Sequence, residues 1–171
     1  NASTGRNKDY VRVTASADNT TIRKNNTLLT TINAGQTYEF YLTSSEKAAY
    51  IETSNPCAVY MYLVSQNAGG SSLGDPSMVW VAPLEQRINS IIFNTFYPSV
   101  SAQNAPEVHI VNIVAETANT SQIRLDGSAI TGWETVTGNT NYSFARKVIS
   151  HAAHSITSTG GNGFIAHVYG I

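Results

Sequence analysis

Residues 10–14 read YVRVT, with valines at positions 11 and 13 set between larger side chains that can meet water. A period of two places successive side chains on opposite faces of a strand, so this segment predicts a strand with one buried face. Similar short segments, each bounded by Gly, Asn, Asp, Ser or Pro, recur at 22–23, 38–42, 51–53, 59–64, 108–113, 123–125 and 164–169. The best helical candidate, 84–92, also suits a strand at its end.

Turn signals such as Asn25-Asn26 and Asp126-Gly127 separate these segments at intervals of roughly 8–12 residues, a spacing typical of antiparallel sandwiches and barrels. We therefore expect an all-β fold, an antiparallel two-sheet β-sandwich of the jelly-roll or Ig-like kind. A chain of 171 residues is long enough to bury a sizeable core without disulfides.

The chain also resembles itself. Three segments of the first part have counterparts in the second: Ile22-Arg23 and Ile123-Arg124, Tyr38 to Phe40 and Tyr142 to Phe144, Ile51 to Thr53 and Ile156 to Ser158. We expect a single β domain over 1–171 with a pseudo-repeat: a first half at 10–66, a connecting segment at 67–107 that contains a Gly-Asp-Pro motif, and a second half at 108–171. Because neither half can leave its apolar face in water, the halves pack as one sandwich or as two joined β lobes.

The composition is that of a globular protein with a neutral surface. Apolar residues make up 42% of the chain and charged residues only 12%, about half the usual share. The net charge is −1 without a basic stripe, which argues against nucleic acid as a partner. No apolar run approaches the roughly 18 residues of a membrane helix, so no membrane insertion is expected. The hydroxyl- and amide-rich surface is typical of secreted or cell-surface β proteins.

Residues that could carry catalysis or hold a metal form no recognisable motif. Cys57 stands alone among apolar neighbours, so a small buried side chain is expected. His151 and His154 are three residues apart, which places them together on a helix but not on a strand. His109 and His167 are expected on the solvent side of strands. We expect no catalytic residues, no metal and no cofactor, and hence a protein that is not an enzyme.

Candidate binding residues lie in and around the segment 73–86, LGDPSMVWVAPLEQ. Pro76 and Pro83 should bracket a strand at 78–81, because proline cannot donate to a ladder and restricts the residue before it. Aromatic side chains within strands, such as Tyr60 and Tyr62, are expected in core or cross-strand packing. The candidate binding residues are Gly74, Asp75, Pro76, Trp80, Glu85, Gln86 and Trp133.

The same segment carries a family resemblance. The blocks NAGQTYEF (33–40), IETSNP (51–56) and GDPSM (74–78) with PLEQ (83–86) resemble the IgGFc-binding protein N-terminal domain family. The resemblance implies an extracellular, non-enzymatic module of a secreted or surface protein, and the low charge favours a bacterial one. It implies adhesion or recognition, with host glycoprotein, mucin or immunoglobulin Fc as partner. The alternatives are a carbohydrate-binding module and a structural spacer of a surface protein.

Overall fold

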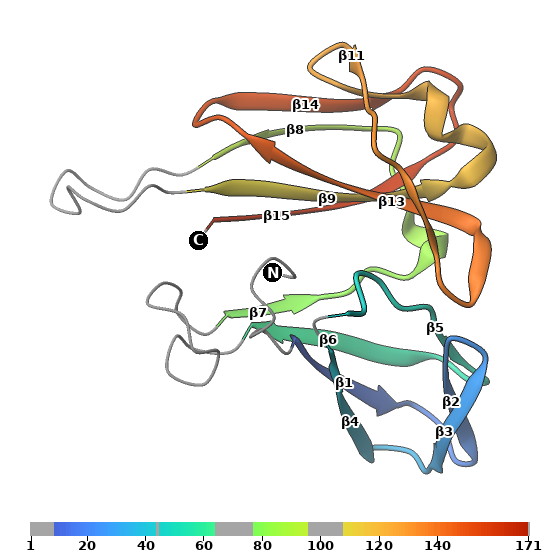
Figure 1. Cartoon of the computed structure of the whole chain (residues 1–171). Coiled ribbons are helices and arrows are strands. Elements are labelled where there is room, and N and C mark those ends of the chain that lie inside the picture. The colour runs from blue at the N-terminus through green and yellow to red at the C-terminus, as the bar shows by residue number, and fades with distance from the viewer. Residues whose placement is uncertain (1–8, 44, 64–76, 96–107, 171) are drawn as a thin grey trace, which may run out of the picture. The chain divides into compact units, whose positions relative to one another are not determined.

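The computed structural model describes residues 9–43, 45–63, 77–95 and 108–170. The chain forms two compact units, here called unit 1 (Asn1–Ala82 with Thr137–Asn139) and unit 2 (Pro83–Val136 with Thr140–Ile171). Nearly all regular structure in the described ranges is antiparallel strand (Figure 1). The prediction of an all-β sandwich is confirmed, and each unit contains two sheets of its own.

Unit 1 packs a four-stranded sheet against a three-stranded one. The first has the order β4-β1-β6-β7 and the second the order β3-β2-β5. The strands are β1 (Asp9–Ala15), β2 (Thr20–Lys24), β3 (Thr27–Ile32), β4 (Thr37–Leu42), β5 (Ile51–Thr53), β6 (Cys57–Leu63) and β7 (Ser77–Trp80). Val11 and Val13 of β1 are 2% and 0% exposed, and Ile22 of the facing sheet is 0% exposed. The valines that alternate in the sequence therefore form the core between the two sheets.

Unit 2 has two four-stranded sheets, with the orders β12-β13-β9-β15 and β11-β10-β14-β8. The strands are β8 (Ser90–Asn94), β9 (His109–Glu116), β10 (Ile123–Leu125), β11 (Ser128–Ala129), β12 (Glu134–Val136), β13 (Asn139–Ile149), β14 (Ala153–Ser158) and β15 (Phe164–Gly170). Two short 3-10 helices, η1 (Leu84–Gln86) and η2 (Thr117–Gln122), connect them. The core includes Ile113, Ile123, Ile156 and Phe164, each 0% exposed.

The two units share a strand order. In the first sheets, β4-β1-β6 corresponds to β13-β9-β15, and in the second sheets β3-β2-β5 corresponds to β11-β10-β14. The register agrees where the sequence matches: Ile22 pairs with Thr53 as Ile123 pairs with Ser158. The duplication expected from the sequence stays a prediction, and this shared strand order is an independent reason for it.

The two-residue turns Asn25-Asn26 and Asp126-Gly127 share one backbone conformation and one kind of side-chain hydrogen bond. All four residues have positive φ, between 49° and 76°, as hairpin turns that follow the twist of their strands require. Oδ1 of Asn25 accepts a hydrogen bond from the backbone N–H of Tyr50, and Oδ1 of Asp126 accepts one from the backbone N–H of Ser155. The turn of unit 2 is thereby tied to β14, and that of unit 1 to the residue directly before β5.

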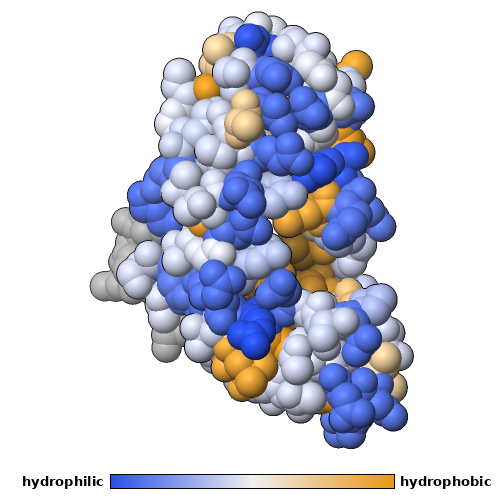
Figure 2. All heavy atoms as spheres, turned by 90° about the vertical axis from the view of Figure 1, so that its right-hand side faces the viewer, coloured by the Kyte–Doolittle hydropathy of each residue, from blue (hydrophilic) through white to orange (hydrophobic). Residues whose placement is uncertain are grey.

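The described part of the segment 73–86, residues 77–86, folds close to expectation. The strand predicted at 78–81 is β7 (Ser77–Trp80), and Pro83 precedes η1. The candidate helix 84–92 is this single 3-10 turn followed by β8, because Ile91 and Phe93 alternate into the core of unit 2. On the face drawn in Figure 2, hydrophilic residues cover most of the surface and apolar residues form separate patches.

Candidate functional site

The sheet β4-β1-β6-β7 of unit 1 turns a set of large side chains away from its core. Tyr10 pairs with Tyr41 of β4 and with Tyr62 of β6, and Tyr62 pairs with Met78 of β7. These four residues form one row across four strands, because directly opposite side chains of antiparallel strands share a face. The adjacent row on the same face runs through Glu39, Arg12, Tyr60 and Trp80. We call the eight residues of the two rows the aromatic face.

The aromatic face is substantially exposed at its ends. Tyr41 is 53% exposed, Met78 60% and Trp80 44%, although all three are large and largely apolar. The ring of Tyr10 lies 5.1 Å from that of Tyr41 and 5.8 Å from that of Tyr62, at interplanar angles of 58° and 62°. The three tyrosines therefore hold one another in place while one side of the row stays in contact with water.

The two charged residues of the aromatic face are paired with each other. Nη2 and Nε of Arg12 both lie 2.6 Å from Oε1 of Glu39. The guanidinium also lies over the ring of Tyr62, 5.4 Å from the centroid, and Nη1 donates to the Tyr62 hydroxyl at 3.4 Å. The face consequently carries two opposite charges that neutralise each other locally.

A shallow groove of about 470 Å³ runs along the row. It is lined by Tyr10, Arg12, Tyr41, Tyr62, Leu63, Ser77 and Met78. Ring faces and apolar side chains form most of its walls, while tyrosine hydroxyls and the Ser77 hydroxyl can form hydrogen bonds. The aromatic walls and few polar groups of this shallow groove resemble the composition of protein interface centres.

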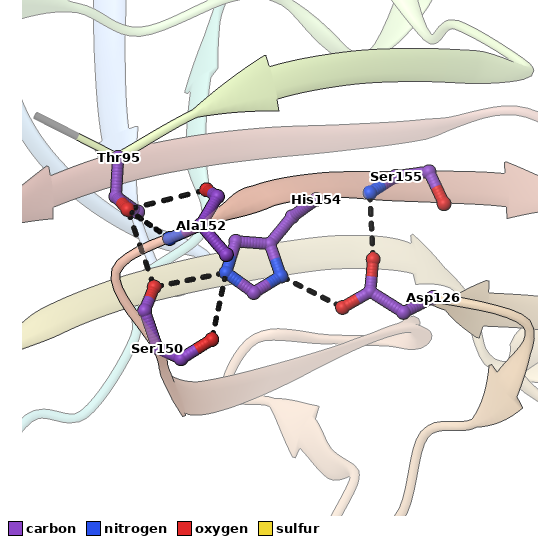
Figure 3. Close-up of polar contacts among 6 residues, drawn as sticks. All are labelled: Thr95, Asp126, Ser150, Ala152, His154 and Ser155. Carbon is purple, nitrogen blue, oxygen red and sulfur yellow. Dashed lines mark hydrogen bonds and ion pairs between the residues drawn. The ribbon is translucent and has the colours of Figure 1, made fainter.

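A polar cluster in unit 2 superficially resembles a catalytic triad (Figure 3). Nδ1 of His154 lies 2.7 Å from Oδ2 of Asp126. Nε2 lies 2.9 Å from the backbone oxygen of Ser150 and 3.5 Å from its Oγ. Oγ1 of Thr95 accepts from the backbone N–H of Ala152 at 2.8 Å and lies 3.2 Å from the backbone oxygens of Ser150 and Ala152. The cluster thus closes the turn between β13 and β14.

The contacts of His154 indicate that this cluster supports structure. Both ring nitrogens face acceptors, a carboxylate and a carbonyl, so both donate in the cationic imidazolium. The hydrogen bond to Asp126, and then that to the Ser150 carbonyl, raises the pKa of His154. The hydrogen bonds from His154 and from the Ser155 N–H lower the pKa of Asp126. An imidazolium whose Nε2 donates to a carbonyl cannot take a proton from the Ser150 hydroxyl.

The other histidines lie on β9, on β15 and in the turn before β14. His109 is 7% exposed, so the expectation of a solvent-side position was wrong: it shares the inner face of β9 with Val111 and Ile113. His167 is half-buried, and this burial lowers its pKa. Within the ranges that the structure describes, no three His, Cys, Asp or Glu side chains converge on a point where a metal ion would fit.

The structure separates the binding residues expected from the sequence. Trp80 ends β7 and belongs to the aromatic face. Glu85 and Gln86 are exposed on η1 in unit 2. Trp133 is half-buried against the core of unit 2, and its indole N–H donates to the Ile130 carbonyl at 3.0 Å. Gly74, Asp75 and Pro76 lie outside the described residues.

Several residues of the aromatic face were absent from the expected set. Alternation indicates that Tyr10 lies opposite the valines of its strand, but it does not show which strands are neighbours. Arg87 was also missed: it donates to the Tyr142 hydroxyl at 2.7 Å and pairs with Glu116 at 3.1 Å, which fixes the chain after η1. Cys57, expected to be buried, is half-buried at the start of β6 and packs against the core of unit 1.

Comparison with known proteins gives one match. The family model described as IgGFc binding protein matches residues 1–170. Neither the curated proteins nor the solved structures contain a match. No helix in the described ranges is both long and apolar enough to span a membrane.

Proposed function

The chain belongs to the IgGFc-binding protein family, and on this premise we propose that it is an extracellular, non-enzymatic recognition module. Its partner is a protein: immunoglobulin Fc, a mucin or another host glycoprotein. The low content of charged residues supports a place on a secreted or surface-anchored protein of a bacterium.

The observation that carries this proposal is the partly exposed row of Tyr41, Tyr10, Tyr62 and Met78 on one sheet of unit 1, with Tyr41 and Met78 at its exposed ends. Aromatic residues with an arginine among them are the usual energetic centres of protein interfaces, because they remove much apolar surface from water. The ring contacts order the tyrosines before a partner arrives, which reduces the entropy lost on binding.

The chemistry of unit 2 supports a binding role over catalysis. The arrangement closest to a catalytic site, Ser150 with His154 and Asp126, places both ring nitrogens of its buried histidine against acceptors. Ser150 therefore has no general base to activate its hydroxyl, whereas binding by the aromatic face requires no such base.

The test is an affinity measurement on immobilised full-length chain with two purified probes, the Fc fragment of immunoglobulin G and a secreted mucin. We expect one of them to bind the wild type, and Tyr41→Thr with Met78→Thr to weaken that binding about 30-fold or more, as loss of an interface centre does. Ile92→Thr is the matched control, because Ile92 is 79% exposed on β8 of unit 2. Equal binding by all three proteins would refute the assignment of the surface.

A further inference from the structure

We propose that the groove on the aromatic face binds a proline-rich segment of the partner in the polyproline II conformation. This inference rests on the proposed function, since it names the part of a protein partner that the groove takes. It follows from the charge, the polar groups and the spacing of the residues that line the groove.

The charge of the groove favours a neutral ligand. Arg12 is the one charged residue among the lining residues that the structure describes, and Glu39 neutralises it across a distance of 2.6 Å. Its guanidinium is further occupied by the ring and hydroxyl of Tyr62. A phosphate or carboxylate ligand would have to displace Glu39 from Arg12, whereas an uncharged segment leaves the pair intact.

The polar groups among the described lining residues suit a proline-rich peptide. These residues carry the hydroxyls of three tyrosines and of Ser77, and the Tyr62 hydroxyl accepts from Arg12. A proline residue has no N–H and exposes only ring carbons and a carbonyl, so aromatic rings can contact its ring carbons while hydroxyls beside them donate to the carbonyl.

The geometry of the row suits an extended segment that crosses the strands. Tyr41, Tyr10, Tyr62 and Met78 lie on four neighbouring strands, so the row spans about 14 Å at the usual strand spacing of about 4.8 Å. Polyproline II rises about 3.1 Å per residue, so about five residues cover the row. Successive tyrosine rings are tilted by 58° and 62°, which makes ridges and furrows where a flat platform would suit a sugar ring better.

The polyproline II conformation also limits the entropic cost of binding. A proline-rich segment is already extended before it binds, so little backbone freedom is lost when it lies along the row. The rings of Tyr10, Tyr41 and Tyr62 are likewise ordered by their mutual contacts. Both sides of the contact are therefore largely prepared for association.

The experiment titrates the full-length chain with an oligoproline peptide of about twelve residues and follows binding by calorimetry. A Gly-Ser peptide of equal length and a neutral chitin oligosaccharide are titrated in parallel. We expect saturable binding of oligoproline only, weakened about tenfold or more by Tyr41→Thr and by Met78→Thr and unchanged by Ile92→Thr. Circular dichroism of each variant establishes that it is folded before its affinity is compared.

Three outcomes would overturn the inference: no oligoproline binding at millimolar concentration, binding that both face variants retain, or saturable binding of the oligosaccharide to the same face. If oligoproline fails while the face variants still lose the Fc or mucin probe, the recognition module stands and only its proline-rich ligand is wrong. If the face variants change neither, the proposed function falls as well.

Discussion

Nδ1 of His154 lies 2.7 Å from Oδ2 of Asp126, and the other oxygen of this carboxylate accepts the backbone N–H of Ser155. Asp126 therefore joins the turn after β10 to the next strand of the sheet, as Asn25 does in unit 1 through Tyr50. In unit 2, Asp126 also forms an ion pair with His154, whose side chain is only 6% exposed.

This ion pair predicts how the stability of unit 2 depends on pH. The folded-state pKa of His154 is raised above 6.5, so its contribution is complete below about pH 6.5 and is lost as the pH rises through the raised value. The pKa of Asp126 is lowered from 3.8, so its contribution is present above that value and is lost as the pH falls through the lowered one. The free energy of unfolding should therefore fall as the pH rises from about 6.5 through the raised pKa of His154.

The matched variant for this pH effect is Asp126→Asn, because Asn25 at the equivalent turn of unit 1 already accepts a backbone N–H, that of Tyr50. It should cost about 1 kcal/mol near pH 6, a modest value because the Asp126 side chain is 46% exposed, and should flatten the decline above pH 6. Urea unfolding followed by Trp133 emission in a Trp80→Phe background measures both the loss of stability and its pH dependence. Parallel pH curves for the two proteins would contradict the assignment.

A close backbone approach in unit 2 gives a second prediction. A Cβ on Gly163 would lie 2.7 Å from Cβ and 3.0 Å from the backbone carbon of Arg87, beside the bridge between Ile88 and Phe164. Gly163→Ala should destabilise unit 2 by about 1–3 kcal/mol in thermal or urea unfolding, because the neighbour is backbone and cannot turn aside.

The control for this substitution is Gly161→Asn. Gly161 has open space around it and a φ of +76°, which asparagine tolerates better than most residues, so a small change is expected. If Gly163→Ala were as mild as this control, the contact between the two segments would be looser than described.

The two cores give a third prediction. Ile22 and Ile123 are each 0% exposed, in the separate cores of unit 1 and unit 2. Either isoleucine replaced by alanine should cost about 2–5 kcal/mol. Ile22→Ala should shift mainly the unfolding transition seen by Trp80, and Ile123→Ala mainly that seen by Trp133. Equal shifts of both probes in both variants would mean that the two units unfold as one.

The sequence was sufficient for the local structure. The alternation in YVRVT placed Val11 and Val13 in a core, and the pairs Asn25-Asn26 and Asp126-Gly127 marked turns, because side-chain direction and positive φ are properties of short segments. The same reasoning failed at His109, the first residue of β9. This strand lies between β13 and β15 in the middle of its sheet, and the side chain of His109 points to the same inner face as that of Val111.

The aromatic face could not be predicted in the same way. Each strand alone showed which side chains lie opposite the core, but Tyr10, Tyr41 and Tyr62 become neighbours only through the order β4-β1-β6, which pairs segments far apart in the chain. For the same reason, the sequence predicted Trp80 as a binding residue but not its neighbours on the aromatic face. It likewise did not show that Trp133 packs against the core of unit 2.

A map of the surface that a bound partner covers tests most directly whether the aromatic face is the binding site. Amide hydrogen exchange of the full-length chain, with and without the probe protein that binds it, locates that surface without any substitution. We expect slower exchange in β1, β4, β6 and β7, around Tyr10, Tyr41, Tyr62 and Met78. Protection confined to unit 2, or no protection of these four strands by a bound partner, would contradict it.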